Sequence, residues 1–257
     1  MSFNLRSADL DRLNSLTKYP SIPTYHRLDP SNGSLTEVAI EFEGPVVLTE
    51  KIDGTNARIV CLPDGSYLIG SRGELLLAKG DLIGNPALGI VDALREVADR
   101  VCSDRREDAI VIYFGEVYGG KVTQASKQYT GERRVGFRLF DVAEIGSYAD
   151  VLGLPKAAIS EWRESGGQSY LPESRLQEAA RRLDLDLTPR LGEVEALPGS
   201  VEEADALLGE IIPETLSALD PKAGGQPEGL VARTEDRSQI AKLRFSDYRR
   251  TLKYRSK

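Results

Sequence analysis

The sequence contains few of the residues that many enzyme sites are built from. Its 257 residues include only two cysteines, Cys61 and Cys102, and one histidine, His26. These residues are too few for a metal site with Cys and His ligands or for a disulfide framework. Any catalysis must therefore use Lys, Arg, Asp, Glu and hydroxyl groups.

Long apolar runs are also missing. No stretch of about eighteen apolar residues is present, and the N-terminus lacks the apolar core of a signal peptide. We therefore expect a cytoplasmic protein that does not associate with membranes. With 40% hydrophobic residues, the chain can still build a sizeable core.

The charge is unevenly distributed along the chain. A net charge of −7 argues against a protein that coats nucleic acid by bulk attraction. Residues 240–257 differ, because they contain seven basic residues and a single acid, Asp247. Such a basic end is usually a solvated tail. Here it directly follows a predicted strand, which favours contacts with phosphates.

Hydrophobic periodicity and turn residues predict strands, then helices, then strands again. The strands are expected at 38–42, 46–50, 57–62, 67–71, 109–117, 135–142, 228–233 and 239–245. Helices are expected within 1–18 and 86–102, and the acidic stretch from about 144 to 222 is expected to be a helical insert. Because hairpins join most strands, we predict an α+β fold with antiparallel sheets and flanking helices, forming one domain over 1–257.

Charged side chains occupy the ends of several predicted strands. Singly, each has a simple interpretation, such as a solvated lysine, a local ion pair or the wet face of an edge strand. Burying an unpaired charge costs several kcal/mol in order of magnitude, so a set of both signs is expected to face one cleft. The set comprises Lys51, Arg72, Glu116, Glu228, Lys242 and Arg244.

This set suits nucleotidyl transfer through a lysine. A free lysine has a pKa of about 10.4, and neighbouring cations and desolvation lower the pKa of an amine so that it can attack a phosphate. Lys242 and Arg244 alternate along their strand and share one face, as a clamp on a triphosphate requires. Glu228 and Glu116 offer hard oxygen ligands for Mg²⁺. A glycine-rich phosphate loop is absent from the sequence, so side chains must form the site.

Six short motifs in order give the chain a family resemblance. It resembles the ATP-dependent RNA ligases, most closely the nick-sealing type 2 RNA ligases among the covalent nucleotidyltransferases. Asn56 stands where DNA ligases and capping enzymes more often have arginine. The matching motifs are Lys51-Ile52-Asp53-Gly54, Ser71-Arg72-Gly73, Phe114-Gly115-Glu116, Phe140-Asp141, Glu228-Gly229-Leu230-Val231 and Lys242-Leu243-Arg244.

The resemblance implies an adenylation domain that uses ATP and Mg²⁺ or Mn²⁺ for RNA repair. Lys51 would form a lysyl-AMP, pass AMP to an RNA 5′-phosphate and let a 3′-hydroxyl displace it. The implied catalytic residues are Lys51, Asp53, Lys242 and Arg244. Glu228 and Glu116 are the implied metal ligands. ATP would contact Glu50, Lys51, Ile52, Asn56, Arg72, Glu116, Phe140, Glu228, Lys242 and Arg244.

Two departures from the family pattern shape the alternatives. Arg244 replaces the second lysine of the last motif, and only thirteen residues follow it, too few for an oligonucleotide-binding barrel or a helical C-terminal domain. A protein partner would then supply that domain. The alternatives are a DNA ligase, a capping-type enzyme, or a non-catalytic module that binds nucleic-acid ends.

Removing residues 248–257 is expected to weaken RNA binding mainly at low salt, because the contribution of this basic segment is expected to be electrostatic.

Overall fold

The computed structural model describes residues 3–78, 81–83, 89–104 and 106–256. Contacts between residues divide the chain into two compact units. Unit 1 comprises Met1–Ser21, Gly54–Thr123 and Val135–Leu187, and unit 2 comprises Ile22–Asp53, Gln124–Arg134 and Thr188–Lys257. Within the single domain expected over 1–257, the two units thus alternate along the chain.

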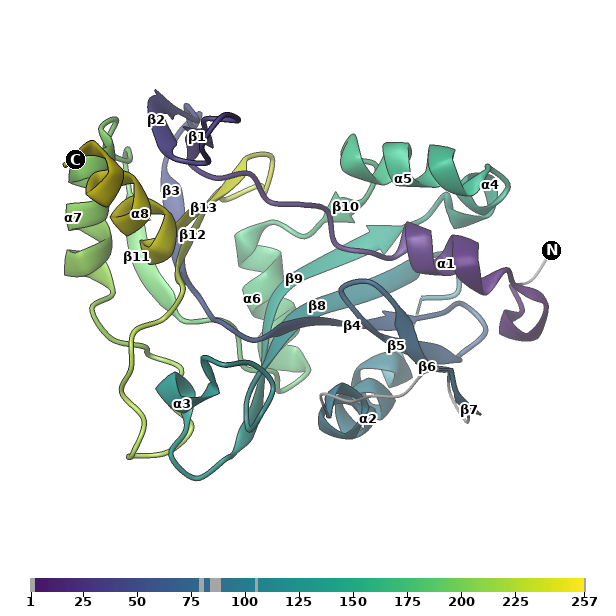
Figure 1. The fold of residues 1–257 in the computed structure, drawn as a ribbon. Coiled ribbons are helices and arrows are strands. Elements are labelled where there is room, and N and C mark those ends of the chain that lie inside the picture. Colours follow the sequence, from purple (N-terminus) through teal and green to yellow (C-terminus); the bar gives the residue numbers. More distant parts are fainter. Residues whose placement is uncertain (1–2, 79–80, 84–88, 105, 257) are drawn as a thin grey trace. The chain divides into compact units, whose positions relative to one another are not determined.

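Unit 1 is built on a seven-stranded antiparallel sheet with the order β10-β9-β8-β4-β5-β6-β7 (Figure 1). The predicted antiparallel α+β architecture is confirmed, with β8 near the sheet centre as its apolar sequence indicated. The strands are β4 (Thr55–Cys61), β5 (Tyr67–Ser71), β6 (Leu75–Ala78), β7 (Asp81–Leu82), β8 (Ile110–Gly119), β9 (Val135–Ile145) and β10 (Ser169–Tyr170).

Helices cover both faces of this sheet. Alternate residues of β4 point to opposite faces, so Ile59 packs into the core that contains α2 residues and Val60 into the core that contains α1 and α5 residues. Burial on both faces explains the long apolar run of β8, whose one charged residue is Glu116. The helical segments of unit 1 are η1 (Leu5–Ser7), α1 (Leu10–Leu16), α2 (Ile90–Val101), η2 (Cys102–Asp104), α4 (Tyr148–Leu152), α5 (Lys156–Glu164) and α6 (Glu173–Arg182).

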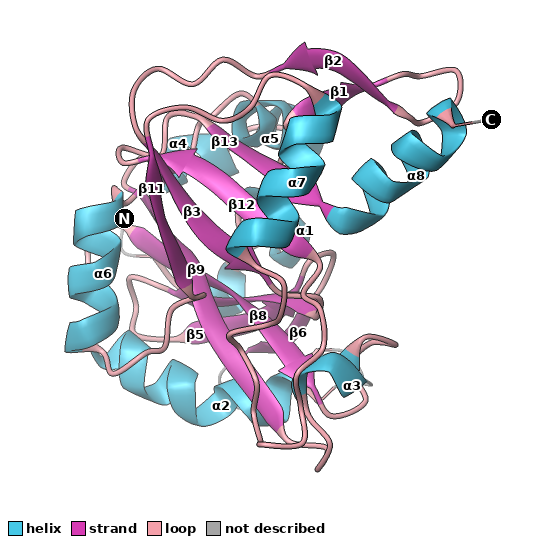
Figure 2. Ribbon diagram, turned by 90° about the vertical axis from the view of Figure 1, so that its left-hand side faces the viewer, coloured by secondary structure: helices cyan, strands magenta, loops and turns pink. Residues whose placement is uncertain are grey.

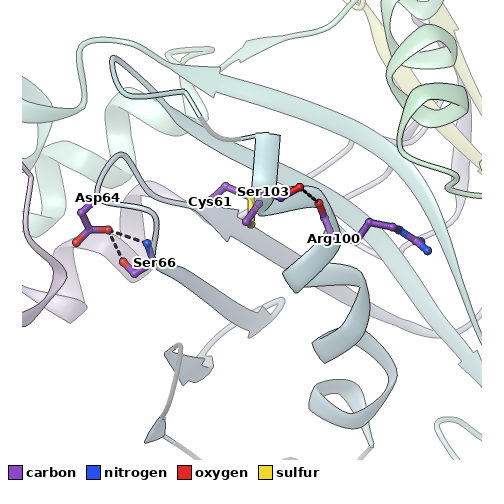
Figure 3. The surroundings of a disulfide bond; sticks show 6 residues. Cys61, Asp64, Ser66, Arg100 and Ser103 are labelled. Carbon is purple, nitrogen blue, oxygen red and sulfur yellow. Dashed lines mark hydrogen bonds between the residues drawn. A yellow bond between two sulfur atoms is a disulfide. The ribbon is translucent and has the colours of Figure 1, made fainter.

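A disulfide joins Cys61, the last residue of β4, to Cys102, which follows α2 (Figure 3). Both cysteines are buried in the core beneath α2. We did not expect this bond, because spacing along the chain does not show that β4 and α2 meet. Disulfides are rare in the reducing cytosol, and the cytoplasmic location stays a prediction.

Unit 2 contains a four-stranded antiparallel sheet with the order β11-β3-β12-β13 (Figure 2). Its apolar face packs against α7 and α8 in one core that includes Leu48, Leu208, Leu230 and Tyr248. A separate hairpin, β1–β2, precedes β3. The elements are β1 (His26–Leu28), β2 (Leu35–Ala39), β3 (Val46–Lys51), α3 (Ser126–Tyr129), β11 (Arg190–Val194), α7 (Val201–Ile211), β12 (Gly229–Thr234), β13 (Ile240–Arg244) and α8 (Phe245–Arg255).

The basic C-terminal segment is a helix of unit 2, whereas such basic ends are usually solvated tails, and its contacts with phosphates stay a prediction. Tyr248 and Thr251 of α8 are buried. The Tyr248 hydroxyl lies 2.8 Å from His26 Nδ1, and Thr251 Oγ1 accepts a hydrogen bond from the Leu35 backbone NH at 2.8 Å. Removing 248–257 would therefore disrupt the fold of unit 2, so its effect on RNA binding would not be purely electrostatic.

Other sequence predictions hold in part. The stretch 144–222 contains helices α4 to α7, but it also contains β10 and β11 and is shared by the two units, so it is not one helical insert. The first helix spans only Leu10–Leu16, and the start of the helix expected over 86–102 falls partly outside the described residues. None of the described helices is long and apolar enough to cross a membrane.

Candidate active site

Lys51 lies at the end of β3, where three strands of unit 2 align charged residues in one row. Lys51 stands opposite Gly229 of β12, and Gly229 stands opposite Arg244 of β13. Lys242 is two pairs further along, opposite Val231. Because residues two apart in a strand share a face, all three cations project from the same side of the sheet. The expected convergence of these three residues is seen within unit 2.

Glu228 directly precedes β12 and links two of the cations. Its carboxylate accepts a short hydrogen bond from Lys51 Nζ, and Arg244 Nη1 lies 3.8 Å from Glu228 Oε1. The three side chains keep only 22% to 31% of their surface exposed. Partial burial weakens screening by water and salt, so this cluster fixes the position of the lysine amine.

Gly229 explains how the row can be so compact. Its φ of +155° is rare for L-residues, and a Cβ atom there would lie 2.0 Å from the backbone oxygen of Leu243. Only glycine therefore fits between the strands that carry Lys51 and Arg244.

Asp247 holds Arg244 from the first turn of α8. Arg244 Nε donates to Asp247 Oδ2 at 2.7 Å, and Arg250 Nη2 donates to the other oxygen at 3.0 Å. The Asp247 side chain is only 3% exposed. An arginine can turn its Nε atom toward Asp247 while its Nη atoms face Glu228, which the single amine of a lysine cannot do. This contact accounts for the arginine at position 244. We did not predict this role for Asp247, whose only signal in the sequence is its place three residues after Arg244.

The Glu50 carboxylate lies on the opposite face of β3 from Lys51. It is 1% exposed and accepts hydrogen bonds from the Thr215 and Ser217 hydroxyls and from the Leu216 backbone NH at 2.9 Å. The structure thus shows Glu50 fastening the segment 215–217 to β3, where we had expected a contact with adenosine. The sequence offered no sign of these partners, which are about 165 residues away.

Tyr129 supports the turn that follows Lys51. Its hydroxyl accepts a hydrogen bond from the Asp53 backbone NH at 2.7 Å, and burial raises the pKa of Tyr129 well above its usual range. Burial also raises the pKa of the Asp53 carboxyl, with the nearby charge of Glu228 as a second cause. Ile52, which lies between Lys51 and Asp53 in the sequence, is buried. Nothing in the sequence around Tyr129 pointed to this contact.

The next part of the lysine motif belongs to unit 1. Asn56 of β4 stands opposite Glu116 of β8. The Asn56 Oδ1 atom is buried and has no hydrogen-bond donor among the described residues. An unsatisfied buried acceptor costs about 1–3 kcal/mol, so it is suited to receive a donor from a ligand. Gly54 lets β4 begin close to β8, because a Cβ there would lie 2.4 Å from the Val117 backbone oxygen.

Arg72 is exposed in the turn between β5 and β6 of unit 1. The fully buried Arg58 supports this turn, since its Nη1 donates hydrogen bonds to the Ser71 backbone oxygen at 2.7 Å and the Arg72 backbone oxygen at 3.2 Å.

Phe140 of β9 packs edge-to-face against Tyr19, with ring centroids 5.0 Å apart.

The predicted site residues therefore fall into two groups. Unit 2 holds Glu50, Lys51, Ile52, Asp53, Glu228, Lys242 and Arg244, and unit 1 holds Asn56, Arg72, Glu116 and Phe140. The two predicted metal ligands, Glu228 and Glu116, belong to different units. Among the described residues, no group of three or more His, Cys, Asp or Glu side chains gathers as a metal cage would require.

Comparison with solved structures supports this fold. An RNA ligase point mutant from Naegleria gruberi, described with ATP and Mn, is 15% identical, with a TM-score of 0.53 over 93% of this chain and 65% of that one. An archaeal ATP-dependent RNA ligase is 20% identical, with a TM-score of 0.52 over 92% of this chain and 51% of that one. The chain thus spans between about half and two thirds of the length of these two proteins.

Comparison of sequences gives the family. No curated protein matches the chain. The family model for RNA ligase matches residues 44–255, which include every predicted site residue. The chain therefore belongs to the RNA ligase family.

Proposed function

We propose that this chain is an ATP-dependent RNA ligase that joins 5′-phosphate and 3′-hydroxyl RNA ends through a lysyl-AMP on Lys51. The observation that carries the proposal is the row of Lys51, Gly229 and Arg244 with Glu228 against the lysine amine. The comparisons add support, because the Naegleria gruberi RNA ligase is described with ATP and Mn, with AMP and Mn, and with PPi. The archaeal RNA ligase is described as ATP-dependent.

Covalent transfer needs a lysine amine that is held in place and loses its proton. The Lys51 nitrogen attacks the α-phosphorus of ATP, a nitrogen–phosphorus bond forms, and the bond to pyrophosphate breaks. Glu228 contacts the amine and is the nearest carboxylate to receive its proton. Lys242 and Arg244, on the same face, offset the charge that develops on the phosphates.

The adenylate then passes to RNA. An oxygen of the RNA 5′-phosphate attacks the phosphorus of the lysyl-AMP, which releases the amine. The 3′-hydroxyl attacks the RNA phosphate, forms the phosphodiester and displaces AMP. In unit 1 the unsatisfied Asn56 Oδ1 atom suits a donor from the nucleotide or the RNA end, and Arg72 offers a permanent charge for phosphate.

A divalent ion would add charge neutralisation at the phosphates. Glu228 and Glu116 remain its proposed ligands. Because the described residues form no metal cage, the ion would take its other ligands from phosphate oxygens and water, as Mg²⁺ commonly does.

The direct test is incubation of the chain with α-labelled ATP or GTP and Mg²⁺ or Mn²⁺, followed by denaturing electrophoresis. We expect covalent label from ATP, none from Lys51→Ala, and none from Lys51→Arg, which keeps a charge for Glu228 but is a poor nucleophile. Lys156→Ala, on the exposed surface of α5, is the control. Label that persists without Lys51 places the nucleophile elsewhere. Label from GTP alone indicates a capping-type enzyme. The absence of label from both nucleotides would contradict the proposal that the chain is an enzyme of this kind.

A further inference from the structure

A surface pocket of about 480 Å³ lies within unit 2, between the β1–β2 hairpin and β13. Two of the proposed catalytic cations, Lys242 and Arg244, form one wall. Arg27 of β1 and Val38 of β2 also line it. The volume is within the range of about 300–1,000 Å³ that is typical of small-ligand sites.

Backbone hydrogen bonds connect the segments that line the pocket. The segment before β1 adds to the edge of β13, because the Lys242 NH donates to the Pro23 oxygen at 2.9 Å and the Tyr25 NH donates to the Lys242 oxygen at 3.0 Å. The contacts of α8 with His26 and Leu35 hold the hairpin. The two walls are therefore fixed relative to each other within unit 2.

The charge of the lining selects an anion. Three cations, Arg27, Lys242 and Arg244, line the pocket and no carboxylate does, although the whole chain carries a net charge of −7. Because Arg244 also pairs with Glu228 and Asp247, the preference for an anion rests chiefly on Arg27. Arg27 is exposed, and its side chain has neither an ion pair nor a hydrogen bond with any of the described residues. A free guanidinium beside two further cations is suited to phosphate.

The apolar part of the lining indicates more than a phosphate. Leu28 and Val38 leave 38% and 60% of their surfaces exposed, and both line this pocket, together with Pro23. Inorganic phosphate or pyrophosphate gains nothing from such surfaces. A sugar and base attached to a phosphate would cover them.

We propose that this pocket binds one nucleotide of the RNA strand next to the reacting end. Arg27 contacts a phosphodiester of that strand, and Leu28 and Val38 contact the adjoining sugar and base. The inference rests on the proposed function, since it adds an RNA subsite to the same ligase. Lys242 and Arg244 would then border both the RNA and the lysine that is adenylated.

Arg27→Ala tests the phosphate contact. We expect its affinity for single-stranded RNA with a 5′-phosphate to fall about tenfold, as for loss of one charged hydrogen bond. The slope of log affinity against log salt should fall by about 0.7, while labelling of Lys51 from ATP keeps its rate. Lys253→Ala removes the same charge from exposed α8 of the same unit and should change RNA affinity much less.

Val38→Glu tests the apolar wall. A carboxylate at this exposed position should repel the strand and lower RNA affinity and the rate of RNA joining together. Val135→Glu, at a residue with 49% exposure in unit 1, controls for added negative charge.

The outcomes separate the inference from the proposed function. A raised KM for ATP in the self-labelling of Arg27→Ala would assign the pocket to the phosphates of ATP and overturn the inference. Unchanged RNA affinity in both variants would also overturn it. If the parent chain takes no label from ATP, the proposed function fails, while the RNA affinities of the same variants still decide whether the pocket binds RNA.

Discussion

Gly229 is the residue on which the alignment of Lys51 with Arg244 depends. A methyl group at this position would meet the Leu243 backbone oxygen at 2.0 Å, and neither strand can move without shifting a charged residue. The glycine of this motif is thus a packing requirement for the cluster around Lys51.

Gly229→Ala should therefore lower the free energy of unfolding by about 2–3 kcal/mol, through steric overlap and an unfavourable φ. Denaturant unfolding measures this loss. Gly224→Ala is a matched control, because Gly224 has a similar φ of +151° but no neighbouring atom lies within 4 Å of the place that a methyl group would occupy. If both variants lose the same stability, the backbone angle alone matters and the close approach to β13 does not.

The surroundings of Asp53 shift the pKa of its carboxyl upward. Burial and the charge of Glu228 raise its pKa in the folded chain. A carboxyl with a higher pKa when folded stabilises the fold at low pH, and this contribution is lost as the pH rises through the unfolded value of about 3.9 and then the folded one. Ionised Asp53 is therefore a cost to stability at neutral pH.

Asp53→Asn should raise the free energy of unfolding at pH 7, and the gain should disappear as the pH falls below about 3.9. Adenylation of Lys51 should fall in the same variant, because the residue is proposed to serve the reaction. Unfolding curves across pH and the labelling assay measure the two effects. A loss of stability at pH 7 would show that Asp53 instead has a favourable ionic partner.

The charged residues at strand ends were predictable from the sequence because each interrupts an apolar β pattern. The residues that hold these side chains in place were not predictable. Asp247, Tyr129 and Thr215 act through contacts that exist only after folding, and they lie in segments whose own patterns are ordinary. Glu50 illustrates the same limit, since alternation along β3 turns it away from Lys51 and toward 215–217.

Helix α8 is an element whose sequence concealed its structure. Its many basic residues suggested a solvated end, yet Tyr248 and Thr251 lie one turn apart and are both buried. Apolar surface was scarce in this segment, so periodicity was a weak signal. The strand 67–71, by contrast, was predicted with its observed bounds because a hairpin turn at 63–66 precedes it.

Tyr248→Phe should destabilise the chain by about 1–2 kcal/mol, because it removes the hydrogen bond to buried His26. Tyr254→Phe, on the same helix at a residue that is 60% exposed, should have no effect on thermal unfolding. Equal stability of the two variants would mean that α8 is not anchored to β1 through this bond.

The disulfide joins two elements of unit 1 that are 41 residues apart in sequence. Cross-linking a loop of this length restricts the unfolded chain and contributes about 3–4 kcal/mol. Reduction by dithiothreitol should lower the free energy of unfolding by this amount. The double variant Cys61→Ala and Cys102→Ala should not respond to the reductant, and a parent chain that also fails to respond would show that the bond does not form.

At the scale of the whole molecule, the site residues are distributed over two units that alternate along the chain. The lysine motif itself crosses from one unit to the other, since Asp53 ends a segment of unit 2 and Gly54 begins one of unit 1. The sequence showed the motifs in order but not this division, because hydrophobic patterns identify strands and not the sheets they join.

The comparison structures are longer than this chain, which covers 65% of the Naegleria gruberi ligase and 51% of the archaeal one. Complete joining of RNA by this chain is therefore a proposal. Adenylation of Lys51 and transfer of AMP to RNA can be measured separately, so a chain that forms the adduct without joining RNA would be recognised.

The central claim is that AMP on Lys51 is an intermediate in RNA joining. It is tested most directly by labelling the chain with α-labelled ATP, removing free nucleotide, mapping the label by peptide mass spectrometry and adding RNA with 5′-phosphate and 3′-hydroxyl ends. We expect an adduct on Lys51, loss of that label on addition of RNA, and adenylated or joined RNA without further ATP. Label on another residue, or an adduct that RNA does not discharge, would contradict it.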